Sequence, residues 1–413
     1  MYFWIMHRLY IFIFFVFSIV FFPSFGALDK GNTHWLLLSV IPLFFLKTFF
    51  DLSFLKSKIF VVYALFISQV IISLFYTNNF NISVVDLSRH LILFTCLVFF
   101  LSLLRSSKFS FYNISLLVSF FLLYEAIASL SALFTFIIDN GFDFSIITSI
   151  QVDSLKGVMG NRNITTASIV IKLPFLFYLI YRSKFHYKFL FGLLSFLPAL
   201  PLFLINSRAA LLSFIFIISV FTLVILFFHT KKSTSLPFIL APLFFAFLFA
   251  SSLVPENDLN TSERISTINF TNESSSQRFF LWENAADYIS QNPFIGCGIG
   301  NWKVESAAYW GSYGDRYLVP FHAHNDFLEF STELGIIGGL TYFILFFLII
   351  YKSFISYFKS KDFKFLILFS SFVALFVDSF LNFPFERPLI QVMFLLLLAL
   401  NIHYDYSNDS KKV

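Results

Sequence analysis

Hydrophobic residues occur along this chain in long, almost uninterrupted runs, and a polar stretch separates each run from the next. A run of about 20 apolar residues is long enough to cross roughly 30 Å of hydrocarbon as a helix. The pattern predicts an all-α integral membrane protein with about twelve transmembrane helices. The expected spans are residues 3–22, 34–50, 58–76, 88–104, 112–138, 164–181, 187–205, 209–228, 236–254, 326–351, 363–381 and 388–403.

The first run, residues 3–22, has the position of a signal peptide but not its pattern. It is longer than the apolar region of a signal peptide, and no small-residue cleavage site closes it. We expect this run to be retained as the first span.

The composition excludes an ordinary soluble domain. Hydrophobic residues make up 58% of the 413 residues and charged residues only 12%, with a mean hydropathy of +0.82. Soluble domains have about 45–50% apolar and about 25% charged residues. Of the two cysteines, Cys96 lies in an apolar run and Cys297 in a polar loop, so we expect neither a disulfide nor a cysteine metal site.

Lysine and arginine are concentrated in alternate short loops, which sets the expected orientation. Cytoplasmic loops carry the excess of these residues, so both termini are expected in the cytoplasm. The net charge of +5 follows from this asymmetry, and we expect no nucleic-acid partner. We divide the chain into residues 1–254 with spans one to nine, an outer loop at 255–325, and residues 326–413 with spans ten to twelve and a short cytoplasmic tail. The outer loop is rich in aromatic residues, so we expect it to fold rather than to act as a linker.

The stretch FHAHNDFLEFSTELG, residues 321–335, gathers titratable groups directly before the tenth span. Asp326 and Glu329 have the spacing of a helix N-cap and its capping-box partner. His322 and His324 fall at the membrane interface, where a neutral imidazole beside a carboxylate is suited to act as a general base. A structural role or a metal site remains open for His324, although no third ligand has the spacing of a zinc site.

Arginine residues begin several outer segments. Arg208, in NSRAALL, is either a snorkelling interfacial residue or an anion clamp. Arg278 is expected in the first turn of an amphipathic helix whose apolar residues are Phe279, Trp282, Ala286 and Ile289; guanidinium and a helix N-terminus together suit a phosphate. The GCGIG run that follows lacks the preceding strand and the lysine of a phosphate loop.

Two further arginines lie at the same expected membrane face. Arg162, in GVMGNRN, lies at the outer end of the sixth expected span, and Arg387, in DSFLNFPFERP, lies near the same surface. Together with Arg208, Arg278 and a histidine, they indicate a lipid-linked polyanion as ligand.

Two charges fall inside the expected spans, Glu125 in the fifth and Lys172 in the sixth. They indicate either an ion pair between neighbouring helices or a proton path. A transporter would carry more such groups along a path through the midplane. Since most ionisable groups gather at one face instead, the pattern favours an interfacial enzyme.

These motifs resemble those of the O-antigen ligases and polymerases of bacterial envelopes. His324 and Asn325 are followed by nine residues and then by Gly335-Ile336-Ile337-Gly338, as in the ligase pattern. Arg208 and Leu212 match an Arg-x3-Leu element, and NPFIGCGIGNW is similar to the Pro-x-x-Gly-x-Gly-x-Gly-Asn run of the family.

The resemblance implies a metal-independent, inverting glycosyltransferase of the GT-C type in the bacterial inner membrane, with its active site facing the periplasm and no cofactor. Its donor would be a glycan on undecaprenyl pyrophosphate. By the same resemblance, His324 and Arg208 would be catalytic. The residues that would bind the pyrophosphate or the glycan are Arg278, Arg162, His322, Asn325, Glu329 and Arg387.

Three acceptors fit this resemblance. A ligase transfers the glycan to a sugar hydroxyl of lipid A–core, a polymerase transfers it to another lipid-linked repeat unit, and an O-oligosaccharyltransferase transfers it to protein. We expect the ligase activity, with the polymerase as the alternative.

Overall fold

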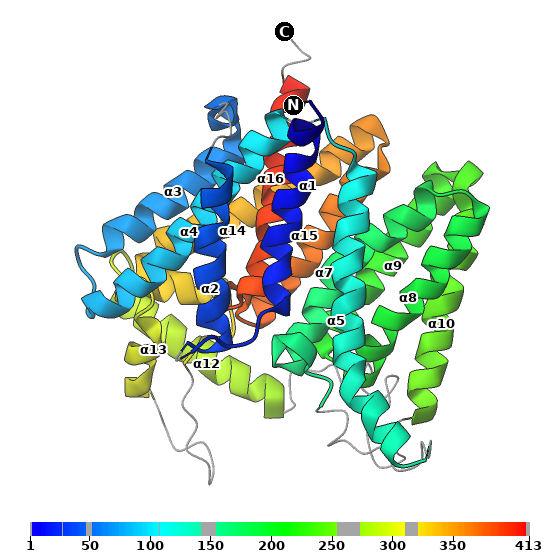
Figure 1. Cartoon of the computed structure of the whole chain (residues 1–413). Coiled ribbons are helices and arrows are strands. Elements are labelled where there is room, and N and C mark those ends of the chain that lie inside the picture. The colour runs from blue at the N-terminus through cyan, green and yellow to red at the C-terminus, as the bar shows by residue number, and fades with distance from the viewer. Residues whose placement is uncertain are drawn as a thin grey trace. The chain divides into compact units, whose positions relative to one another are not determined.

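The computed structural model describes residues 2–26, 28–46, 52–106, 108–141, 154–253, 273–309 and 321–409, and the regular elements within these ranges are helices (Figure 1). Among them, nine helices are long and apolar enough to cross a membrane, and two shorter apolar helices cover His7–Phe21 and Lys58–Ser73. The prediction of an all-α multi-pass membrane protein is confirmed.

The helices follow the hydrophobic runs closely. In chain order they are α1 Tyr2–Ser18, α2 Lys30–Val40, α3 Lys58–Ser73, α4 Phe80–Ser106, α5 Phe111–Asp139, α7 Arg162–Arg182, α8 Phe185–Ile205, α9 Arg208–Phe228, α10 Leu236–Leu253, α12 Glu273–Gln291, α13 Trp302–Glu305, α14 Asp326–Ser360, α15 Phe363–Leu381 and α16 Pro388–Asp409. Helices α12 and α13 lie within the expected outer loop, whose residues 255–272 and 310–320 fall outside the described ranges.

The second expected span, residues 34–50, differs from the prediction. Helix α2 ends at Val40, and a 3₁₀ helix, Ile41–Phe45, continues the chain. Pro42 stands at the start of that 3₁₀ helix. Proline has no backbone N–H to donate to the preceding turn, and at this position the chain changes from α to 3₁₀ geometry.

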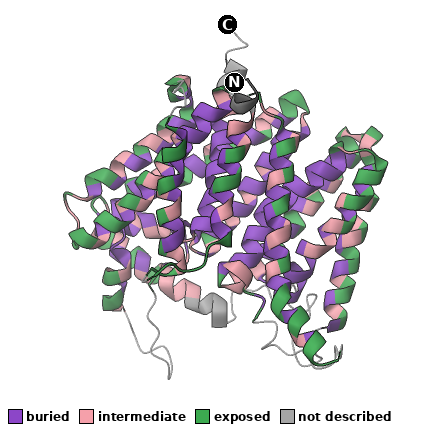
Figure 2. Ribbon diagram, in the orientation of Figure 1, coloured by how far each residue is buried: buried purple, intermediate pink, exposed green. Residues whose placement is uncertain are grey.

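The chain divides into two compact units. Unit 1 comprises residues 1–108, 270–352 and 378–413, and unit 2 comprises residues 109–269 and 353–377. In unit 1, α16 packs against α1, α2, α3 and α4, and the consecutive residues 394–400 of α16 are all buried. Figure 2 shows this burial along the helices of the unit.

Helix α7 is the centre of unit 2. It packs against α5, α8, α9 and α10, and the whole of its most apolar 18-residue window is buried. An apolar helix surrounded by other helices has no polar face, which is why no amphipathic pattern marks this segment in the sequence.

The buried charges of unit 2 form an ion pair. Nζ of Lys172 donates to both carboxylate oxygens of Glu125 at 2.9 Å, and both side chains are almost completely buried. The hydroxyl of Ser168 donates to Oε2 of Glu125 at 2.9 Å and also contacts Nζ of Lys172. The interpretation of these residues as an ion pair between neighbouring helices is confirmed.

We predict that Lys172→Met destabilises the protein by about 3 kcal/mol, because it leaves the carboxylate of Glu125 buried without its cation. The double variant Glu125→Gln/Lys172→Met should recover most of that loss, since no uncompensated charge remains. Thermal unfolding of the purified protein in detergent measures both. Equal destabilisation by the single and the double variant would contradict the assignment.

Candidate functional site

The glycine-rich run of residues 293–302 is fastened to α14 by backbone hydrogen bonds. The N–H of Cys297 donates to the carbonyl of Thr332 at 3.0 Å, and that of Gly298 to the carbonyl of Glu333 at 2.9 Å. Two residues later, α14 is kinked at Gly335, whose φ is 75° and ψ 173°. The run therefore pairs with α14 at the kink.

Glycine is required in this run because of close approach. A Cβ on Gly296 would overlap the backbone of Thr332, and one on Gly300 would overlap the carboxylate of Asp86 in α4. Gly300 also has a φ of 75°, which L-residues with side chains rarely adopt. The GCGIG run thus brings three segments into backbone contact, which accounts for its glycines without a bound phosphate.

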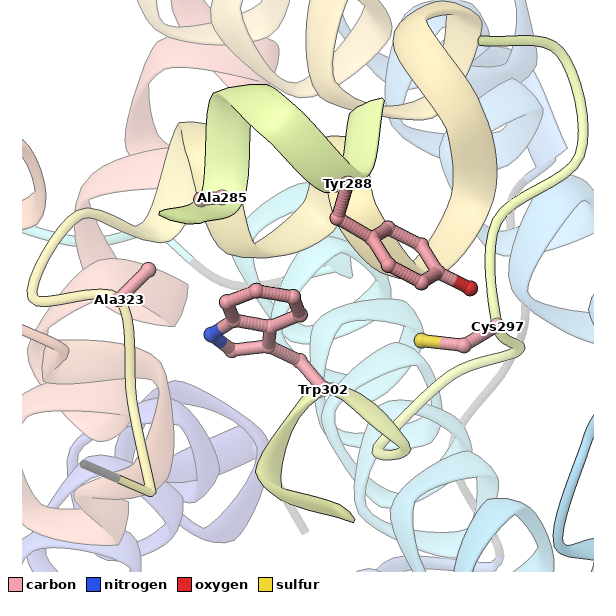
Figure 3. Close-up of a cluster of buried hydrophobic side chains, with 5 residues drawn as sticks. All are labelled: Ala285, Tyr288, Cys297, Trp302 and Ala323. Atoms are coloured by element: carbon pink, nitrogen blue, oxygen red, sulfur yellow. The ribbon is translucent and has the colours of Figure 1, made fainter. Parts of the chain in front are cut away.

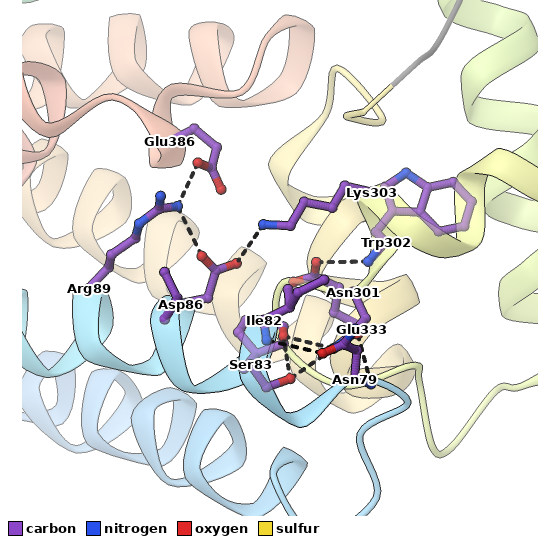
Figure 4. A network of polar contacts seen from close by, with 12 residues as sticks. Asn79, Ile82, Ser83, Asp86, Arg89, Asn301, Trp302, Lys303, Glu333 and Glu386 are labelled. Carbon is purple, nitrogen blue, oxygen red and sulfur yellow. Dashed lines mark hydrogen bonds and ion pairs between the residues drawn. The ribbon is translucent and has the colours of Figure 1, made fainter. Parts of the chain in front are cut away.

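Asn301 fixes the run to the start of α4. Its Nδ2 donates to Oγ1 of Thr77 at 2.7 Å and to Oγ of Ser83 at 2.8 Å, and its Oδ1 accepts from the N–H of Asn79 at 3.0 Å (Figure 4). Oε1 of Glu333 accepts from the N–H of Trp302 at 3.2 Å. Both ends of the turn are therefore tied to helices of unit 1.

A small apolar cluster lies beside this run. Trp302 contacts Tyr288 of α12 edge to face, and both pack in a buried group with Ala285, Cys297 and Ala323 (Figure 3). On α12 the buried positions are therefore Ala285 and Tyr288, whereas Ala286 is exposed; the predicted amphipathic helix is present, but its buried stripe is displaced from the expected one.

The histidine segment begins α14, and its cap differs from the prediction. Oδ1 of Asn325 accepts from the N–H groups of Phe327 and Leu328, at 3.0 and 3.1 Å. Asn325 is thus the N-cap, and Asp326 is the first helical residue rather than the cap. The expected capping box was wrong because the asparagine one residue earlier makes these bonds itself.

Glu329 holds the histidine segment with both of its oxygens. Oε1 accepts from Nδ1 of His322 at 2.8 Å, and Oε2 accepts from the N–H of Ala323 at 2.9 Å. His324 follows with a φ of 52°, a left-handed conformation that is uncommon for residues other than glycine. Strain of this kind persists where the surroundings fix the backbone, as Glu329 and the Asn325 cap do here.

The ring of Phe383 contacts both histidines and lies near one arginine of the candidate site. The ring of His322 stacks on it with centroids 4.4 Å apart, and the ring of His324 meets it edge-on at 4.8 Å. The guanidinium of Arg387 lies 5.1 Å from the same ring centroid. This role could not be predicted from the residue pattern, since Phe383 is one of 66 phenylalanines.

The two histidines have opposite electrostatic environments. Burial lowers the pKa of His324 to about 4, and the positive charges of Arg278, His322 and Arg387 contribute to the shift, so its imidazole is neutral at physiological pH. Burial also acts to lower the pKa of His322, but the charge and hydrogen bond of Glu329 outweigh it, and the pKa is raised overall. A neutral base thus stands beside cationic groups.

Arg278 lies in the second turn of α12, not in the first, because the helix begins at Glu273. Its NH2 donates to Oδ1 of Asn382 at 3.3 Å, and Nδ2 of Asn382 in turn donates to Oδ1 of Asp378 at 2.6 Å. The guanidinium is therefore oriented from α15 rather than by the helix N-terminus.

Unit 1 brings together six of the eight candidate residues. His322, His324, Asn325, Glu329, Arg278 and Arg387 all belong to it. Arg162 and Arg208 belong to unit 2, where they begin α7 and α9, two helices that pack on each other. The role of Arg162 and Arg208 in the same site as the histidines stays a prediction.

Sequence reasoning missed a second charged group in unit 1. NH1 of Arg89 donates to Oδ1 of Asp86 at 2.9 Å and to Oε2 of Glu386 at 2.8 Å, and Nζ of Lys303 lies 4.0 Å from Oδ2 of Asp86 (Figure 4). The spacing of Asp86 and Arg89, opposite charges three residues apart at the start of an apolar run, was the available signal. Across the described ranges, no group of three or more His, Cys, Asp or Glu residues is arranged to hold a metal ion.

Part of the chain, which includes the glycine-rich run and the histidine segment, matches a known protein family. Residues 193–343 match the O-antigen ligase family. The match includes Arg208, the glycine-rich run and the histidine segment, so the resemblance drawn from these motifs is confirmed.

Two curated relatives are similar over shorter segments. Each is named "Putative polysaccharide ligase": one, from Rickettsia conorii, is 33% identical over 106 residues, and the other, from Rickettsia felis, is 33% identical over 100 residues. The matched segment is 23% of this chain and 23% or 24% of the relatives, so the chain spans about a quarter of their length.

We predict that Gly300→Ala destabilises the protein by about 1–3 kcal/mol more than Gly160→Ala. Both glycines have a positive φ, 75° and 71°, so the conformational strain is shared, but only at Gly300 would the new Cβ meet another residue, Asp86. Thermal unfolding of the two variants gives the comparison. Equal losses would show that the close approach to α4 is not what requires glycine.

Proposed function

We propose that this protein is a glycosyltransferase of the O-antigen ligase type. It moves a glycan from undecaprenyl pyrophosphate to a sugar hydroxyl of lipid A–core at the periplasmic face of the inner membrane. The observation that carries the proposal is a neutral imidazole, His324, held beside the cationic groups of Arg278 and Arg387. A base and an anion site side by side are what transfer from a diphosphate requires.

His324 removes the proton from the acceptor hydroxyl. Its Nδ1 is buried and has no hydrogen-bond partner within the described part of the chain, so Nε2 is the nitrogen available to a substrate. The hydroxyl oxygen then bonds to the anomeric carbon while the bond from that carbon to the phosphate oxygen breaks. The electron pair leaves with the diphosphate, and the configuration at the carbon is inverted.

Arginine side chains stabilise the departing diphosphate. Arg278 and Arg387 supply positive charge next to His324, and His322 adds to it when protonated beside Glu329. Guanidinium groups bind phosphate oxygens in pairs, which suits a diphosphate whose negative charge grows as the bond breaks. We extend the proposal to Arg208 and Arg162, each of which begins a helix, where free N–H groups also favour anions.

A ligase and a polymerase differ in the acceptor that receives the glycan, so an assay that identifies the acceptor distinguishes them. Purified protein in detergent is incubated with undecaprenyl-pyrophosphate-linked glycan and lipid A–core, with EDTA present and ATP absent. Glycan appearing on lipid A–core supports the ligase, and lengthening of the glycan on its carrier indicates the polymerase. Absence of any transfer overturns the proposal.

We predict that His324→Ala lowers kcat by about 10²–10⁴-fold, the usual contribution of a general base, without loss of the folded protein. His186→Ala is the matched control, since this histidine is exposed on unit 2 and should be replaceable without effect. The transfer assay above gives the rates. Full activity in His324→Ala would remove His324 from the mechanism.

We predict that kcat/KM falls on the acid side near pH 4 rather than near the pKa of a free imidazole. Because the pKa of His324 is lowered, the base form exists at all pH values above about 4 and is lost only below it. A pH profile of kcat/KM reports the ionisation of the free enzyme and measures this directly. An acid limb at about pH 6.5 would contradict the lowered pKa.

A further inference from the structure

An acidic cavity lies next to the histidine segment, within unit 1. Its carboxyl-bearing residues come from α4, α14 and the turn before α16, and the remaining lining is Ile299, Phe330 and Phe385. The five carboxyl groups are those of Asp86, Asp326, Glu329, Glu333 and Glu386.

The cavity has a buried end and an accessible end. Asp86, Asp326 and Glu333 are buried, whereas the side chains of Glu329 and Glu386 keep 13% and 22% of their surface exposed. The space between them is on the order of one water molecule. It therefore admits a single hydroxyl, hydroxymethyl or amino group from the side of Glu329 and Glu386, but not a whole sugar ring.

Hydrogen-bond acceptors exceed donors in this cavity. Asp86 and Glu386 share Arg89, and Glu333 accepts from the N–H of Trp302. Oδ2 of Asp326 is buried and has no hydrogen-bond partner among the residues that the structure describes. A buried carboxyl oxygen without a hydrogen-bond partner costs free energy, so this end of the cavity is suited to a ligand group that can hydrogen-bond to it.

Glu329 connects the cavity to the base. It lines the cavity and also holds His322 and Ala323, the two residues before His324. Carboxyl groups are unfavourable neighbours for a diphosphate, whereas the guanidinium groups of Arg278 and Arg387 beside His324 favour one. Inverting displacement needs the acceptor and the leaving group on opposite sides of the anomeric carbon, so we assign the acceptor to the cavity and the diphosphate to the arginines.

From this geometry we propose that the acidic cavity binds a donor group, O–H or N–H, of the acceptor sugar and so places its reacting hydroxyl beside His324. The inference rests on the proposed function and adds to it the subsite and the chemistry that recognises the acceptor. Glu386 and Asp326 are the residues that contact the sugar group.

The test uses methyl glucoside and methyl glucosaminide as probes, observed by saturation-transfer NMR on the purified full chain in detergent. Both should bind to the wild-type protein, and Glu386→Gln should weaken binding at least threefold, because an amide replaces an accepting carboxylate. Glu283→Gln on the exposed face of α12 is the matched control and should bind as the wild type does. Tighter binding of the glucosaminide identifies an ammonium group as the preferred donor, and equal binding identifies a hydroxyl.

Inorganic pyrophosphate is titrated into the same samples. Pyrophosphate should bind equally well to the wild type and to Glu386→Gln. Failure of pyrophosphate to bind to the wild type would contradict the proposed function, whatever the sugar probes show. Should Glu386→Gln fail to fold by thermal unfolding, Asp326→Asn takes its place with the same expectation. Absence of sugar binding to the wild type, unchanged binding in a folded variant, or equal loss of sugar and pyrophosphate would overturn the cavity as an acceptor subsite.

Discussion

The approach of the backbone of residues 296–300 to α14 and α4 is the constraint on which the site depends. The helices come so close to this run that Gly296 and Gly300 leave no space for a Cβ. Backbone hydrogen bonds to Thr332 and Glu333 and the side chain of Asn301 then lock the contact. With the run fixed at both ends, Trp302 packs on α12, and Glu333 accepts a hydrogen bond from the N–H of Trp302. Uncharged residues therefore hold the helices that carry the charged groups of the site.

Charges of both signs surround the histidine segment. Burial and the positive charges of Arg278, His322 and Arg387 lower the pKa of His324. Nearby, Asp86 and Glu386 share Arg89, and Lys303 lies 4.0 Å from Asp86. Glu329 binds His322 and also lines the acidic cavity. His324 itself is held in a left-handed conformation that is uncommon for residues other than glycine.

The sequence predicted the helices better than it predicted the contacts of the site. Hydropathy places most spans because crossing hydrocarbon demands long apolar helices. It differs from the structure at residues 34–50, where α2 ends at Val40 and a 3₁₀ helix that contains Pro42 follows. Residues 321–335 could be predicted as a candidate site, because so many titratable groups rarely occur together directly before a membrane span. Phe383 was not, because nothing local distinguishes it from the other phenylalanines. The group of Arg89, Asp86 and Glu386 was not either, because Arg89 and Glu386 are almost 300 residues apart in the chain. The cap at Asn325 was a local feature that the spacing of Asp326 and Glu329 obscured.

The buried pair of unit 2 has a consequence for biogenesis. Lysine near the centre of a helix opposes insertion from the translocon by about 2.5–3.5 kcal/mol, and α7 carries both Lys172 and Pro174. Its neutralising partner, Glu125, is on α5, which is synthesised earlier. Insertion of α7 is therefore favoured when α5 is still beside the translocon, because Glu125 then neutralises the charge of Lys172 as α7 leaves the aqueous channel.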